Sequence, residues 1–218
     1  MHVFEELWRS TVGRKALVAV SGLALWIWVI LHVLGNLTIF SGAAAIDGYA
    51  AALRRVPAGM WVARAALAAA AAVHVAGVVS LARASRAARP RHAAPTRRTP
   101  DAIAAHTMRL GGALLLAFVA YHVLHLTFGV MHPHFTPGRV YDNVVLGLRP
   151  AWIAAVYVAA AALLGLHLFP GLWAAVRSLG MRPDAIGGRR RPAVAVLAAA
   201  MALGFAAVPV AVLAGWVR

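Results

Sequence analysis

The stretch ALVAVSGLALWIWVILHVLGNLTIF, residues 16–40, decides the fold, because it is an apolar run without a single charged residue. About 20 apolar residues in a helix, at roughly 1.5 Å each, cross the roughly 30 Å hydrocarbon core of a bilayer. The stretch therefore predicts a membrane-spanning helix, and His32 lies well inside it. A polar ring at that depth is costly unless it is hydrogen-bonded or coordinates a metal, so His32 requires a partner.

The composition of the whole chain agrees with a membrane protein. Of its 218 residues 62% are hydrophobic, and the mean hydropathy is +0.78, whereas soluble domains are roughly 45–50% apolar. The chain has no cysteine, which excludes disulfides, thiolate-bound iron–sulfur clusters and covalently attached c-type haem. Any redox cofactor must therefore be held by other side chains, and the ten histidines are the candidates.

Apolar runs of membrane-spanning length recur along the chain. They predict five transmembrane helices, at about 16–40, 58–82, 106–131, 150–175 and 192–216. We therefore expect an all-α integral membrane protein in which residues 1–218 form a single membrane domain. The first run is too long for a signal-peptide core, and residues 1–10 predict a short interfacial segment before it.

The formal net charge of +15 indicates topology. Most of the 21 basic residues precede the first helix, occupy the linker 83–105 or lie between the fourth and fifth helices. By the positive-inside rule the N-terminus is cytoplasmic and the C-terminus lies outside, in a bacterial inner membrane, and nucleic-acid binding is not needed to explain the charge. The linker is expected either to contact anionic lipid headgroups or to dock a cytoplasmic partner.

Four histidines lie deep in the apolar runs, one on each of the first four helices. Helix direction places His32 and His122 on the outer side of the bilayer centre and His74 and His167 on the cytoplasmic side. Two imidazoles from facing helices are the axial ligands of a b-type haem. The first four helices are therefore predicted to form a bundle that holds two stacked haems.

Glycines support this hypothesis more weakly. Gly35 and Gly77 follow a histidine by three positions and share its helix face, where a missing side chain admits a porphyrin. Gly22 and Gly112 precede a histidine by ten positions, near the level of the other haem. Glycine is also common in membrane helices for packing alone.

Four segments around these histidines resemble a known family. They are SGLALWIWVILHVLGNLTIFSG at 21–42, VHVAGVVSLA at 73–82, MRLGGALLLAFVAYHVLHLTF at 108–128 and LLGLHLFPGLW at 163–173. They are similar to the histidine motifs of the single-chain, di-haem cytochrome b anchor of succinate dehydrogenases and fumarate reductases. The resemblance covers essentially the whole chain, including the histidine-free fifth helix.

The resemblance implies a role for each histidine and for the chain. It implies that His32 and His122 ligate the distal haem near the outer face, and that His74 and His167 ligate the proximal haem. The motif favours His122 over His125, which is expected beside the haem or the quinone. The chain would be the membrane anchor of respiratory complex II. It would pass electrons from an iron–sulfur subunit, itself fed by an FAD-containing flavoprotein, to menaquinone, in a complex that can form higher oligomers.

The quinone site remains open at this stage. Polar residues near the membrane surfaces are candidates for binding the quinone or a haem propionate: Ser21, Asn36, Asp47, Tyr49 and Arg54. The alternative is helix capping for Asn36 and Asp47, and lipid-headgroup contact for the basic residues. His132 and His134, in the predicted outer loop 132–149, are expected to be surface residues.

Three other functions remain as alternatives. One is a fumarate reductase anchor, which runs the reaction in the reverse direction. Another is the di-haem cytochrome b of a different quinone-linked dehydrogenase, such as a hydrogenase or formate dehydrogenase. The third is a haem-free transporter that uses membrane histidines to relay protons.

Overall fold

A computed structural model describes residues 2–88, 100–180 and 190–218. These residues form helices and connecting turns, without a β-strand. The prediction of an all-helical protein with five membrane-spanning helices is confirmed, since five helices in the described residues have the length and hydropathy to cross a membrane. Their bounds are α2 Thr11–Leu37, α4 Pro57–Ala87, α5 Pro100–His122, α7 Ala151–Ser178 and α8 Arg190–Leu213.

Two of these helices end in a turn of different geometry. The 3₁₀ helix η1, Thr38–Ser41, continues α2, and the π-helix η2, Val123–Thr127, continues α5. α4 ends at Ala87 and α5 begins at Pro100. Both helices therefore extend into the basic linker that the sequence predicts at 83–105. Most arginines of this linker lie outside the described residues.

Three short helices accompany the five spans: α1 His2–Arg9, α3 Ala43–Arg54 and α6 Val140–Leu148. The segment 132–149 was predicted as a loop, and its second half is instead the helix α6. Val144, Val145 and Leu148 of α6 are buried and pack in one cluster with Ile39 and Ile46. A nine-residue helix is too short to be detected by a search for membrane spans, and its apolar face is evident only once its partners are known.

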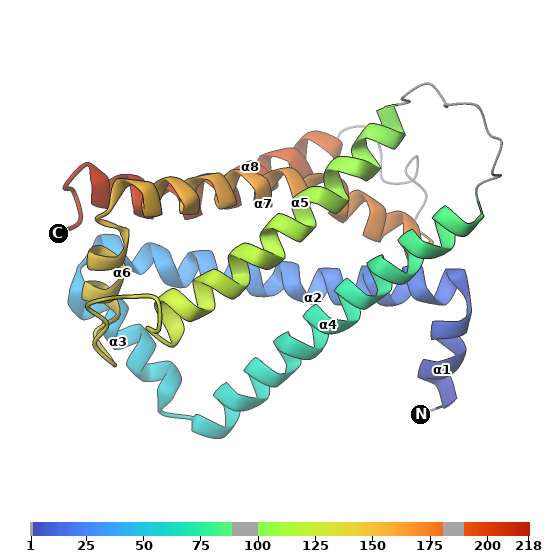
Figure 1. Ribbon diagram of the computed structural model, residues 1–218. Helices are drawn as coiled ribbons and strands as arrows, with labels where there is room; N and C mark the ends of the chain where they lie inside the picture. The colour runs from blue at the N-terminus through green and yellow to red at the C-terminus, as the bar shows by residue number, and fades with distance from the viewer. Residues whose placement is uncertain (1, 89–99, 181–189) are drawn as a thin grey trace.

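Figure 1 shows how the helices are arranged. α3, α6 and the C-terminus gather at one end of the long helices, and α1 lies at the other end, where α4 finishes and α5 starts. The large buried cluster is formed by residues of η1, α3, α6, α7 and α8 together with Val217, so it closes the end that carries α3 and α6. Arg86 and Arg177 lie in the last turns of α4 and α7 at the opposite end, so the two ends differ chemically.

The long helices are unequally covered. α2 packs against α4, α7 and α8, and α5 packs along α7, whereas α4 and α5 make no extensive contact with each other in their described parts. In the most apolar 18-residue windows of α4 and α5 only 6% of the residues are buried, against 28% in α7 and α8. The two helices that carry His74 and His122 therefore have wide faces that no other part of the described chain covers.

Small residues allow the closest helix contacts. A Cβ atom on Gly77 of α4 would lie 2.5 Å from Cγ2 of Val18 on α2, and a Cβ atom on Gly165 of α7 would lie 2.9 Å from Cβ of Ala202 on α8. Such distances are below van der Waals contact, so only glycine permits these approaches. The two contacts hold α4 on α2 and α8 on α7.

Candidate functional site

The structure brings His32 of α2 and His122 of α5 together. Their ring centroids are 5.7 Å apart, and the ring planes are inclined by 78°. A metal ion with histidine bonds of about 2 Å, placed between two opposed imidazoles, would hold the ring centres about 6 Å apart. Nδ1 of His122 is buried without a hydrogen-bond partner in the described structure. The spacing of this outer pair therefore fits two axial ligands, and the role itself stays a prediction.

The inner histidines are His74 of α4 and His167 of α7. Nδ1 of His74 donates a hydrogen bond to the backbone carbonyl of Val18 (3.1 Å), and the hydroxyl oxygen of Ser21 lies 3.5 Å from the same nitrogen. A hydrogen bond from one ring nitrogen to a carbonyl fixes the tautomer and leaves the other nitrogen free to bind a metal. His74 thus has the support typical of a metal-ligating histidine.

The glycines separate into two groups. A Cβ atom on Gly22 would lie 3.0 Å from Cε1 of His74, and one on Gly112 would lie 3.2 Å from Cε1 of His167. The absence of a side chain at these two positions leaves room for the inner histidine rings. At two other glycines another side chain of the protein occupies the space beside the backbone. Tyr49 lies against Gly35, and Val18 lies against Gly77.

His125 lies in a different environment from His122. It is fully buried, and its Nδ1 shares a hydrogen bond with Oη of Tyr157 (2.9 Å). Its ring stacks on that of His132 with the centroids 5.1 Å apart, while Nε2 has no hydrogen-bond partner in the described structure. The π-helix η2 contains His125 and begins directly after His122, and π-helical turns are frequent at functional sites.

The prediction that His132 is a surface residue is wrong. Only 5% of it is exposed, because its Nε2 donates to the backbone carbonyl of Asn143 (2.8 Å) and its Nδ1 accepts from the backbone amide of His134 (3.1 Å). Gly147 of α6 lies against the same ring. His134 is exposed, as expected. The sequence offered no signal for this cluster, since it depends on α6 folding back over the end of α5.

The candidates for a quinone or propionate site are dispersed. Ser21 is buried at the level of His74 and donates to the carbonyl of Leu17. Tyr49 packs against Gly35, and Arg54 is exposed in the last turn of α3. Asn36 is half-buried near the end of α2. The structure therefore does not unite these residues in one site.

Asp47 forms a structural hydrogen bond and does not face an open binding site. Its Oδ1 accepts a hydrogen bond from the backbone amide of Tyr141 (2.9 Å), in the first turn of α6. Amide groups at a helix N-terminus have no partner within the helix, and a carboxylate there is favourable. Asp47 thus links α3 to α6 and caps the latter.

We expect Asp47→Ala to lower the free energy of unfolding by about 1 kcal/mol, the usual cost of losing a helix cap, without changing the cofactor content. The control is Glu6→Ala, which removes an exposed carboxylate of α1, and which should cost less because exposed charges contribute little. Thermal unfolding of both variants in detergent measures the difference. Equal stability of the two variants would contradict the capping role.

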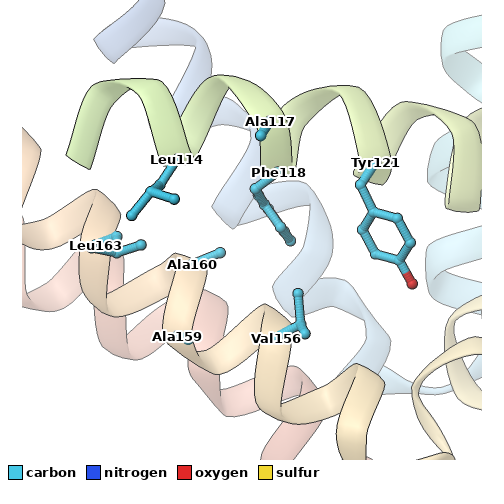
Figure 2. Close-up of a pocket in the computed structure, with 8 residues that line it drawn as sticks. All are labelled: Leu114, Ala117, Phe118, Tyr121, Val156, Ala159, Ala160 and Leu163. Atoms are coloured by element: carbon cyan, nitrogen blue, oxygen red, sulfur yellow. The ribbon is translucent and has the colours of Figure 1, made fainter. Parts of the chain in front are cut away.

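A groove lies between α5 and α7. Its volume is about 340 Å³, and Figure 2 shows side chains of α5 facing those of α7 across it. It is lined by Leu114, Ala117, Phe118, Tyr121, Val156, Ala159, Ala160 and Leu163. The Tyr121 hydroxyl is the one polar side-chain group in this lining. The groove therefore suits an apolar chain and has little with which to recognise a polar head group.

The described residues contain no group of three or more histidine, cysteine, aspartate or glutamate side chains that could hold a metal ion. Haem iron needs only two axial protein ligands, since the porphyrin supplies the other four nitrogens.

Comparison of the chain with protein families, with curated proteins and with solved structures finds no match. The support for a function therefore comes from the geometry of the histidine pairs and from the motifs of the sequence.

Proposed function

We propose that this chain is the cytochrome b membrane anchor of a succinate:quinone oxidoreductase, with two b haems. The observation that carries the proposal is the contact between His32 and His122, whose ring centroids are 5.7 Å apart. These two side chains come from helices that are separated by about 90 positions in the chain. An unpaired polar ring in a membrane is costly, so two such rings brought to a spacing that fits two axial ligands support a shared iron.

The donor set fits haem. Imidazole is a common axial ligand, and His32 with His122, and His74 with His167, would hold the two irons. Bound haem supplies one-electron transfer. The chain itself orients the inner ligand through the hydrogen bond from His74 to the carbonyl of Val18, and Gly22 and Gly112 leave room for the rings of His74 and His167.

The uncovered faces of α4 and α5 also support a cofactor of large area. Their most apolar windows are only 6% buried, and the two helices make no extensive contact with each other over their described residues. A porphyrin between the helices would cover part of these faces, and lipid acyl chains would cover the rest. A haem-free transporter would use the paired rings as a proton relay instead, so haem content separates the two functions.

Partners and orientation follow from the motifs and the charge. We propose that a flavoprotein and an iron–sulfur subunit dock at the basic, cytoplasmic end and that menaquinone takes the electrons. The chain would be a multi-pass protein of the bacterial inner membrane, with its N-terminus in the cytoplasm. A fumarate reductase anchor, or the di-haem subunit of another quinone-linked dehydrogenase, would use the same histidine pairs and differ in its soluble partners.

The test is to purify the chain with its natural partners from a mild detergent extract. We expect a pyridine haemochrome assay to find two b haems per chain, and we expect the copurified subunits to be an FAD protein and an iron–sulfur protein. Absence of haem would favour the transporter. If two haems are found with other soluble subunits, the chain is still a di-haem cytochrome b, but the assignment to succinate dehydrogenase is overturned.

A further inference from the structure

The fifth membrane helix, α8, carries no histidine, and yet it contacts a predicted haem ligand. The ring of Phe205 lies 5.6 Å from the ring of His32, centroid to centroid, with the planes inclined by 40°. Phe205 is half-buried, whereas Leu203 on the same helix is 71% exposed. One face of α8 is therefore directed toward α2 and the outer histidine pair.

The backbone of α8 is held close to α2 beside this contact. A Cβ atom on Gly204 would lie 2.7 Å from Cγ2 of Val33, the residue after His32. Val33 is 1% exposed, so it has little freedom to move away. On its other side α8 approaches α7, where Gly165 meets Ala202. These two contacts determine where Phe205 lies.

His32 is surrounded by rings. Trp28, one turn earlier on α2, stacks on it with the centroids 6.3 Å apart and the planes inclined by 11°. Phe205 lies on it from α8, and His122 meets it edge-on from α5. No hydrogen bond to His32 occurs among the described residues, whereas His74 has its bond to Val18. Ring packing thus restrains the orientation of the outer histidine, whereas a hydrogen bond to Val18 orients the inner one.

We infer that Phe205 of the fifth helix is a positioning residue that holds the imidazole of His32 in its orientation as an axial ligand of the outer haem. The inference rests on the proposed function, because it assumes haem at the His32–His122 pair. Groups behind an axial ligand set its ring orientation and tune the iron. The fifth helix would then serve the cofactor as well as the packing of the bundle.

The experiment compares Phe205→Leu, which removes the ring and keeps an apolar side chain, with Leu203→Ala on the exposed face of the same helix. Electron paramagnetic resonance of the oxidised, purified complex resolves the two low-spin haems, and a His32→Ala variant assigns the outer one. We expect Phe205→Leu to shift the low-field signal of the outer haem or to lower its occupancy. The signal of the inner haem should not change, and Leu203→Ala should match the parent protein. Phe205→Tyr, which keeps the ring, should restore the parent signal.

Two results would overturn the inference. One is an unchanged outer signal in Phe205→Leu. The other is an equal change in both haems, or the same change in Leu203→Ala, because either would indicate general loosening of the bundle. Absence of haem from the parent protein would instead overturn the proposed function, and this outcome is distinct from the other two.

Discussion

Replacing His74 with alanine is expected to remove one of the two b haems and to leave the other in place. The same component should disappear in His167→Ala, and the second component should disappear in His32→Ala or His122→Ala. The reason is that, in the proposed function, each haem would depend on two axial imidazoles from different helices, as the ring contact of His32 with His122 suggests for the outer pair. Haem per chain, measured by pyridine haemochrome and by low-temperature spectra, should fall by about half in each variant.

Two further histidines provide the controls. His134→Ala alters an exposed residue of the outer connection and should keep both haems. His125→Ala should also keep both, because the described contacts of His125 are with Tyr157 and with the rings of Tyr121 and His132. If His125→Ala removed a haem and His122→Ala did not, the ligand on α5 would be His125. If His74→Ala and His122→Ala removed the same component, the pairing itself would be wrong.

The second large effect is expected at the contact between α2 and α4. Gly77→Leu should prevent α4 from packing on α2, because even a Cβ atom at this position would lie 2.5 Å from Cγ2 of Val18. Overpacking typically costs about 1–3 kcal/mol, and more where the backbone cannot move. Displacing α4 would also take His74 away from the carbonyl of Val18. We therefore expect a large loss of folded protein, and loss of the inner haem from what remains.

The control is Gly48→Leu, an exposed glycine of helix α3 beside which a Cβ atom would meet nothing within 4 Å. This variant should be obtained in normal yield with both haems. The measurement is yield and monodispersity in detergent, followed by haem content. Equal tolerance of leucine at the two positions would show that the α2–α4 contact is not what restricts position 77.

The sequence alone determined the five membrane spans, because crossing a bilayer imposes a length and an apolar composition that are local properties of each segment. It also predicted which histidines share a level along the bundle, since successive spans alternate in direction and the level follows from counting residues along each helix. His32 and His122 could therefore be assigned to one level before any contact was known, and the structure brings their rings together.

The tertiary structure alone decided which groups surround each histidine. The burial of His132, the hydrogen bond of His125 with Tyr157, and the contact of Phe205 with His32 all join elements that are distant in the sequence. Such contacts depend on how each helix is rotated about its axis and which neighbour it packs against, and local sequence does not specify either. Glycines illustrate the difference. Gly77 and Gly112 look alike in the sequence, yet the side chain of Val18 lies against Gly77 and the ring of His167 lies against Gly112.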